Sequence, residues 1–337
     1  MKRSVLATAM LALATLNMHV LAQSINGAGA TFPYPIYSKW FSEYNRLHPD
    51  VKINYQSIGS GGGIRQVSDG IVDFGATDSP MSDQQIASAR FKTWHIPTVL
   101  GAIVPVYNLP EVHQDLNFSG DVIADIYLNK IKKWNDPRIA KDNPGVNLPD
   151  QPILAVYRSD GSGTTFIFTD FLCKVSEDWK RTVGRSTSVR WRSGIGQKGN
   201  EGVAGIVRQA PYSLGYVELV FAVRNHMAFG KIKNPAGNFI KGSTASVTAA
   251  AAATAQSIPA DFRVSLTNAP GANSYPISSF TWLLIPQASR DPSKAKALNG
   301  FLNWMLDHGE AEAETQSYAP LPQQLKDMVR KVIIQVK

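Results

Sequence analysis

Three turns rich in glycine, serine and threonine, each followed by an apolar helical pattern, constrain this chain more than any other feature. They occupy residues 27–32 (GAGATF), 59–63 (GSGGG) and 159–164 (SDGSGT). A helix N-terminus presents free backbone N–H groups and the positive end of the helix dipole, so it binds anions readily. One such turn is also an ordinary helix start, because serine and threonine cap many helices. Three of them in one chain predict a binding site for a tetrahedral oxyanion.

The first residues have the pattern of a secretory signal peptide. Lys2 and Arg3 precede an apolar run over residues 5–16, and residues 20–22 (VLA) resemble a signal-peptide cleavage site. We therefore expect residues 1–22 to be removed and the mature, exported chain to begin near Gln23. The apolar run is too short to span a membrane, and no later run is long enough.

Charge and cysteine content narrow the class of protein. The formal charge of +8 includes Lys2 and Arg3, so it is +6 without these two residues. This excess could favour an anionic ligand, but most of it is typical of ordinary solubility charge. No run of Lys and Arg alternates with aromatic residues, so we expect no nucleic-acid partner. Cys173 is the only cysteine, and its apolar neighbours predict a buried, unreactive thiol.

Strand and helix patterns alternate along the chain. Strands are predicted at residues 51–55, 71–76, 96–109, 153–157, 212–220 and 281–285, and helices after Thr31 and at residues 64–69, 168–179, 248–255, 292–308 and 322–334. This alternation predicts an α/β fold with mostly parallel sheets flanked by helices, and the length suggests two domains. The strand at 96–109 is long enough to cross between them. Ligands in such folds bind beyond the carboxyl ends of strands, where Ser60, Asp78 and Arg158 lie.

Known catalytic motifs are absent from the three turns. A nucleotide P-loop needs Gly-Lys-Ser/Thr, but Gly63 is followed by Ile64 and Arg65. The dinucleotide fingerprint fails because Phe32 stands in place of the third glycine, and Ser162 does not lie in Gly-x-Ser-x-Gly. The histidines have no metal-binding spacing and are predicted to be surface or supporting residues, so we expect no metal and no cofactor. Asp73 is expected to be structural.

Four segments together resemble one family. Residues 27–33 (GAGATFP), 55–63 (YQSIGSGGG), 72–78 (VDFGATD) and 158–164 (RSDGSGT) are similar to the phosphate-binding protein of bacterial phosphate ABC transporters. Residues 125–136, 199–202 and 215–218 extend the resemblance over nearly the whole mature chain, although residues 234–271 match least. The resemblance implies a type II periplasmic-binding-protein fold, a periplasmic location, and delivery of phosphate to a membrane permease and its ATPase.

The resemblance also implies the ligand contacts. It assigns phosphate binding to Thr31, Phe32, Ser60, Asp78, Arg158, Ser162, Gly163 and Thr164, with Asp160 positioning Arg158. Asp78 would accept the ligand's proton, and Arg158 would supply the one full positive charge. We expect the chain to cross between lobes near Pro105 and Gly271. Lobe I would then comprise residues 23–105 and 271–337, and lobe II residues 106–270.

The expected function is therefore a monomeric periplasmic receptor for inorganic phosphate and not an enzyme. Other binding proteins for oxyanions such as sulfate or arsenate are the nearest alternative. A secreted phosphatase with Ser162 or Ser60 as nucleophile is a second, although neither serine has a neighbouring base motif or metal ligands in the sequence. An adhesive or signalling role of the surface is a third.

Overall fold

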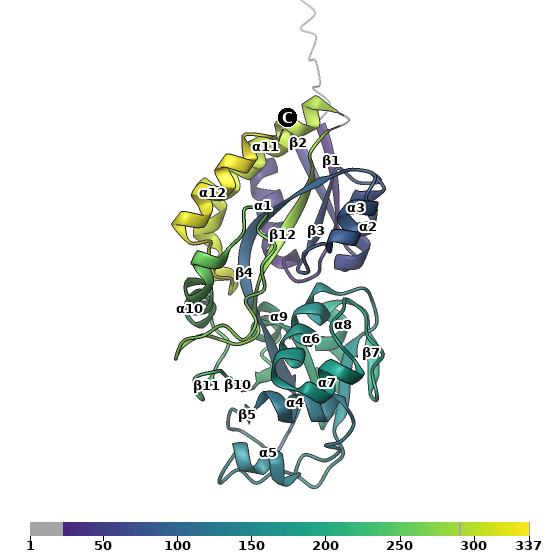
Figure 1. The fold of residues 1–337 in the computed structure, drawn as a ribbon, viewed down its shortest axis with the longest axis vertical. Coiled ribbons are helices and arrows are strands. Elements are labelled where there is room, and N and C mark those ends of the chain that lie inside the picture. Colours follow the sequence, from purple (N-terminus) through teal and green to yellow (C-terminus); the bar gives the residue numbers. More distant parts are fainter. Residues whose placement is uncertain (1–22, 290, 337) are drawn as a thin grey trace, which may run out of the picture.

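One long strand, β4 (Thr93–Tyr107), runs through both halves of the molecule (Figure 1). The computed structural model describes residues 23–289 and 291–336, so the predicted signal peptide, residues 1–22, lies outside the described residues. From His95 onward every residue of β4 is buried. The first part of β4 pairs with the strand Ser278–Pro286, and its last five residues pair with the strand Ser213–Glu218. The apolar stretch predicted at 96–109 thus lies mostly in a buried central strand, which ends at Tyr107.

Strands and helices alternate as the sequence predicts. The strands are β1 (Gln23–Gly29), β2 (Val51–Ser57), β3 (Phe74–Thr77), β4, β5 (Asn117–Phe118), β6 (Leu154–Arg158), β7 (Ile195–Gln197), β8 (Ser213–Glu218), β9 (Ala228–Phe229), β10 (Lys231–Lys233), β11 (Phe239–Ile240) and β12 (Ser278–Pro286). The α-helices are α1 (Tyr34–Leu47), α2 (Ser60–Ser68), α3 (Asp83–Ser88), α4 (Gly120–Tyr127), α5 (Pro137–Asp142), α6 (Gly163–Val175), α7 (Glu177–Thr182), α8 (Gly199–Gln209), α9 (Leu219–Arg224), α10 (Thr244–Thr254), α11 (Pro292–Asp307) and α12 (Gln323–Ile333).

The main sheet is mixed and has the strand order β2-β1-β3-β12-β4-β8-β6-β7, with β9 beside β4. Its outer strands pair in parallel, β1 with β2 and β3, and β6 with β7 and β8. The central strands β12 and β4 are antiparallel to their neighbours. The α/β class is confirmed, while the antiparallel centre arises because β12 returns from a distant part of the chain. The alternation of strand and helix patterns along the sequence does not indicate that a late strand pairs in the centre of the sheet.

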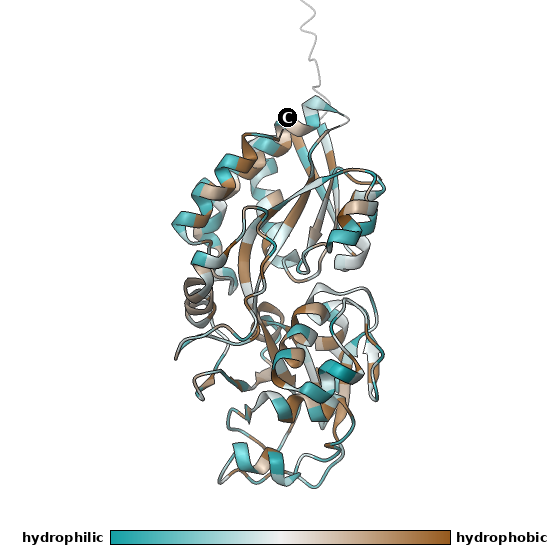
Figure 2. Cartoon of the chain, in the orientation of Figure 1, coloured by the Kyte–Doolittle hydropathy of each residue, from teal (hydrophilic) through white to brown (hydrophobic). Residues whose placement is uncertain are grey.

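Helices cover the sheet in two groups, which we call the upper and lower halves after their positions in Figure 1. The upper half holds β1, β2, β3 and β12 with α1, α2, α11 and α12. The lower half holds β6, β7 and β8 with α4, α6 and α8. Apolar residues are concentrated on the strands and on parts of the helices (Figure 2). One continuous apolar core joins both halves and buries Trp40, Trp134, Trp179 and Trp282 completely.

Several local predictions need correction. The strand predicted from residue 71 begins at Phe74, because Asp73 instead accepts a hydrogen bond from the Asn26 N–H and pairs with Lys294. The helix predicted through Trp179 is divided at Ser176, whose side chain accepts from the Trp179 N–H and so starts α7.

One side chain differs from expectation, one histidine is a supporting residue as predicted, and one small sheet was not predicted. Cys173 is only half-buried. His95 is buried and accepts a hydrogen bond from the Met81 N–H. The strands β5, β10 and β11 form a separate three-stranded sheet, and none is longer than three residues. Strands this short have too few residues to show a period-two pattern. Within the described ranges, no helix has the length and apolar character needed to cross a membrane.

A buried carboxylate, Asp170 on α6, ties the lower half to the segment that leads into β12. Its oxygens accept hydrogen bonds from Ser265 and Thr267 at 2.6 and 2.5 Å, and they pair with Arg185 at 2.5 Å and Lys174 at 3.2 Å. Burial alone would raise the pKa of Asp170. The two hydroxyls and the two cations outweigh burial and lower the pKa to about 2. The charged form of Asp170 therefore stabilises the fold.

Replacing Asp170 with Asn should destabilise the protein at neutral pH. A pKa lowered from 3.8 to about 2 corresponds to about 2 kcal/mol of unfolding free energy at pH 7. This stability is fully present above the unfolded-state pKa and is lost as pH falls through the folded-state value. Urea unfolding should therefore show about half of this deficit at pH 3. Asp121→Asn, on an exposed position of α4, is the control, and an equal deficit at both pH values would contradict this account.

Candidate ligand-binding site

The N-termini of two helices, α2 from the upper half and α6 from the lower half, meet almost in contact. The Gly61 N–H donates to the carbonyl oxygen of Gly161 at 2.9 Å. A Cβ atom on Gly163 would lie 2.4 Å from the Ser60 hydroxyl oxygen and 2.7 Å from the Asp78 side chain. No side chain fits there, so glycine is required at position 163 for this approach.

Several backbone N–H groups around this contact have no hydrogen-bond acceptor among the described residues. Those of Phe32, Ser60, Gly163 and Thr164 are among them. The N–H groups on either side of Gly163 and Thr164 are satisfied, since the Ser162 N–H donates to Thr187 and the Thr165 N–H to the Ser162 hydroxyl. Free N–H groups at converging helix starts are the arrangement that binds an anion. The aromatic ring of Phe32 is fully buried in the core, so only its backbone is available here.

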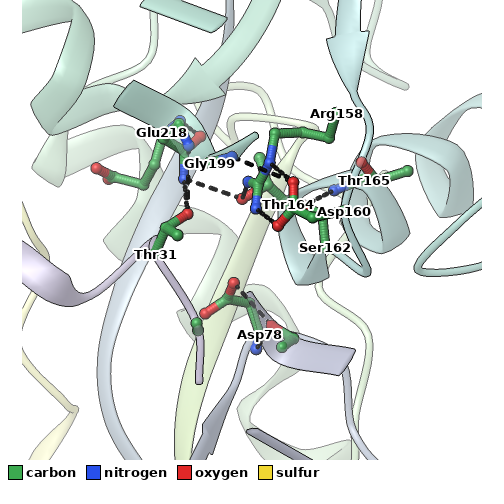
Figure 3. Close-up of polar contacts among 12 residues, drawn as sticks. Thr31, Asp78, Arg158, Asp160, Ser162, Thr164, Thr165, Gly199 and Glu218 are labelled. Atoms are coloured by element: carbon green, nitrogen blue, oxygen red, sulfur yellow. Dashed lines mark hydrogen bonds and ion pairs between the residues drawn. The ribbon is translucent and has the colours of Figure 1, made fainter. Parts of the chain in front are cut away.

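Arg158 ends β6 and supplies the positive charge nearest to these N–H groups (Figure 3). Its guanidinium is held by Asp160 through two hydrogen bonds, Nε to Oδ1 at 2.8 Å and Nη2 to Oδ2 at 2.6 Å. A third bond runs from Nη1 to the Thr164 hydroxyl at 3.3 Å. Burial alone would raise the pKa of Asp160, but its bonds and attraction to Arg158 lower that pKa below its usual range. This bidentate pair fixes the plane of the guanidinium.

Asp78 follows β3 and directs its carboxyl group toward the lower half (Figure 3). It is 1% exposed, and its oxygens accept from the hydroxyls of Thr281 at 2.8 Å and Ser60 at 3.3 Å. Burial raises the pKa of Asp78 to about 7, because the Thr281 bond and the charge of Arg158 offset burial only in part. Asp78 can therefore accept or give up a proton near neutral pH.

The structure brings all of the predicted ligand residues together at the junction of the two halves. Thr31, Phe32, Ser60 and Asp78 come from the upper half, and Arg158, Asp160, Ser162, Gly163 and Thr164 come from the lower half. This arrangement offers many neutral donors, one guanidinium and one carboxyl of adjustable protonation. It suits a small oxyanion that carries a proton. Among the described residues, no cluster of three or more His, Cys, Asp or Glu side chains is placed to hold a metal ion.

Sequence reasoning missed two residues of this site. Asn200, the second residue of α8, donates to the hydroxyls of Thr31 and Thr164. Thr281 on β12 donates to Asp78. The only signal for Thr281 is a hydroxyl between two aromatic residues, Phe280 and Trp282, of a buried strand. Asn200 lies in a segment that contributed to the family resemblance, but nothing in that segment indicated its contacts.

Comparison with known proteins gives the same family in sequence and fold. Residues 19–308 match the family described as PBP superfamily domain. The phosphate-binding protein PstS of Pasteurella multocida is 46% identical over 317 residues, which cover 94% of this chain and 90% of that protein. PstS of Methanocaldococcus jannaschii is 37% identical over 336 residues, covering 93% and 86% of the two chains.

Solved structures share the fold at much lower identity. A high-affinity periplasmic phosphate-binding protein solved with bound phosphate has a TM-score of 0.73 and 21% identity, covering 92% of this chain and 93% of that one. An ABC-type phosphate transport receptor from Vibrio cholerae has a TM-score of 0.56 and 17% identity, covering 88% and 100%. The fold class expected from the sequence is therefore confirmed.

The raised pKa of Asp78 gives a testable pH dependence of stability. The unfolded chain releases this proton near the ordinary value of 3.8, whereas the folded protein keeps it until about pH 7. Folding is therefore penalised progressively between pH 4 and 7, by up to roughly 1.4 kcal/mol per pH unit. Asp78→Asn removes this penalty. Ligand-free unfolding curves should show the variant gaining stability relative to wild type over that range, and a constant difference would refute the assignment.

Proposed function

This chain belongs to the phosphate-binding proteins of bacterial-type ABC transporters within the PBP superfamily, and we propose that it captures inorganic phosphate at the junction of its two halves. It is a substrate-binding protein of an importer and not an enzyme. Its partners are phosphate and the permease with its ATPase. The single observation that carries the proposal is the convergence of free backbone N–H groups, Arg158 and the buried carboxyl group of Asp78 on one small space.

We propose that phosphate contacts eight residues directly. These are Thr31, Phe32, Ser60, Asp78, Arg158, Ser162, Gly163 and Thr164, and Asp160 orients Arg158 without touching the ligand. Support comes from the unpaired N–H groups and from the Ser162 hydroxyl, which accepts from Thr165 and can turn its own proton to a ligand. Each hydrogen bond to a charged ligand contributes about 1.5–3 kcal/mol. A set of hydrogen-bond donors of this kind can bind a dianion although few of the protein side chains around it are charged.

Two lobes are proposed to close on the ligand. Lobe I comprises residues 23–105 and 271–337, and lobe II residues 106–270. In support, β4 passes from its pairing with β12 to its pairing with β8 between Ala102 and Ile103, close to Pro105. Gly271 has a φ of 111°, which glycine adopts readily. The contacts Gly61–Gly161 and Thr31–Asn200 join the halves across the site. Because these contacts would part when the halves separate, we identify the structure as a closed form.

Closure should be visible in solution. Phosphate makes contacts with both lobes only in the closed form, so it shifts the population toward that form. Small-angle scattering should show a smaller radius of gyration with phosphate than without it. Sulfate at the same ionic strength is the control and should leave the profile unchanged. Identical profiles in phosphate, sulfate and ligand-free buffer would contradict the hinge.

We also propose that the protein acts in the periplasm as a monomer. The signal-peptide pattern of residues 1–22 supports export. A structural neighbour is described as a periplasmic phosphate-binding protein. Measuring the mass of the exported protein would test cleavage before Gln23.

Phosphatase activity is the alternative class of function, and it can be tested directly. Ser60 lies beside Asp78, but the Ser60 hydroxyl also accepts from the Asp78 N–H, which holds it in place. No described histidine hydrogen-bonds to Ser60 or Ser162 as a general base would. Incubation with a chromogenic phosphate ester distinguishes the classes, because an enzyme gives many turnovers and a receptor binds one phosphate per chain.

Selectivity for phosphate over sulfate should depend on Asp78. Near neutral pH phosphate carries a proton that Asp78 can accept, whereas sulfate is fully deprotonated and presents only lone pairs to it. A site with such a buried partner can reject the wrong ligand by on the order of 10⁴. Calorimetric titration should give one tightly bound phosphate, negligible sulfate binding and tolerance of arsenate. Asp78→Asn should reduce the ratio of phosphate affinity to sulfate affinity, chiefly because sulfate binds more tightly to the variant. An unchanged ratio would show that Asp78 does not determine selectivity.

A further inference from the structure

Asn200 occupies the point where the two halves and the two threonine hydroxyls of the site meet. Its side chain is fully buried. The side-chain nitrogen donates to Thr31 Oγ1 at 2.8 Å and to Thr164 Oγ1 at 3.2 Å, and the Asn200 backbone N–H lies 3.4 Å from Thr31 Oγ1. The side-chain oxygen accepts from the Glu218 N–H at 3.2 Å. A backbone N–H can only donate, so the orientation of the amide is fixed.

This orientation determines what the threonine hydroxyls can do. A hydroxyl group has one proton to donate and two lone pairs that accept. The Thr31 hydroxyl accepts from Asn200, and the Thr164 hydroxyl accepts from Asn200 and from Arg158 Nη1. Within the described chain neither hydroxyl donates to a protein acceptor. Both protons are therefore left for another acceptor in the site.

We infer that Asn200 is a positioning residue that fixes the Thr31 and Thr164 hydroxyls as donors to the bound anion and stabilises the closed form. The inference rests on the proposed phosphate-binding function. The Thr31–Asn200 bond joins the turn after β1 of the upper half to α8 of the lower half. It can form only when the halves are together. The same amide thus couples closure to the presentation of two donors, which favours an anion whose oxygens accept them.

Substitutions of Asn200 separate this role from simple packing. Asn200→Ala leaves the hydroxyls free to rotate, so phosphate binding should weaken about tenfold. Asn200→Asp keeps the size of the side chain and the bond from Glu218, but a carboxylate only accepts. It would draw the Thr31 and Thr164 protons away from the anion and add a negative charge. Binding should then weaken by at least about a hundredfold. If Asn200 only fills space, the Asp variant binds like wild type and better than the Ala variant.

A buried asparagine elsewhere in the lower half provides a matched control. Asn143 follows α5, is 3% exposed, and its amide bonds to the backbone of Asn117 and Ile139. Asn143→Asp should lower thermal stability without changing phosphate affinity. Calorimetry on wild type and all variants gives the dissociation constants, and thermal melts show which variants fold. Wild type that binds no phosphate would overturn the proposed function. If wild type binds phosphate and the Asn200 variants bind it with the same affinity, only the present inference would be overturned.

A double-mutant cycle tests whether the negative charge added by Asn200→Asp is the whole cause of weaker phosphate binding. It uses only uncharged substitutions, so it still applies if the Asp variant does not fold. Thr31→Val removes the hydroxyl that Asn200 orients. If Asn200 acts through that hydroxyl, combining Thr31→Val with Asn200→Ala should weaken phosphate binding by clearly less than the product of the two single effects. Fully multiplicative losses would show that Asn200 does not act through Thr31 and would overturn the inference.

Discussion

The approach of α2 and α6, N-terminus to N-terminus, is the interaction on which the rest of the site depends. Two helix N-termini carry partial positive charge and repel each other when nothing lies between them. Here they are close enough that a Cβ on Gly163 would overlap the Ser60 hydroxyl. An anion at this point offsets the repulsion and satisfies the free N–H groups of both helices. Under the proposed function, ligand binding and closure of the two halves would therefore follow from one electrostatic requirement.

The balance of full charges explains why neutral donors dominate. Arg158 is buried, but Asp160 holds it through two hydrogen bonds and compensates much of its charge. Asp78 is buried as well, and its pKa is raised to about 7. A fully deprotonated dianion would be repelled by an ionised Asp78, whereas an anion that keeps a proton can share that proton with the carboxylate. In the proposed binding mode, backbone dipoles would supply affinity, while Asp78 would distinguish protonated from unprotonated anions.

Much of the site could be predicted from the sequence because its residues lie in turns directly after strands. The Gly-rich turns lead into α2 and α6 as predicted, and the alternation of elements gave the α/β class. Contacts made by distant segments could not be predicted. Asn200 meets Thr31 across 169 positions, and Thr281 meets Asp78 across 203. The antiparallel return of β12 has the same origin, since sequence periodicity reports the faces of one element and not its partner.

Thr281 shows how the return of β12 contributes to the chemistry. The strand lies between β3 and β4, and its register places Trp282 opposite Thr77, the residue before Asp78. The preceding residue, Thr281, then donates its hydroxyl to Asp78 Oδ1. That bond favours the ionised carboxyl and limits the rise in its pKa that burial causes. Without it, Asp78 would hold its proton at higher pH and accept a ligand proton less readily. The strand that closes the centre of the sheet thus also sets the proton affinity of the carboxyl group in the site.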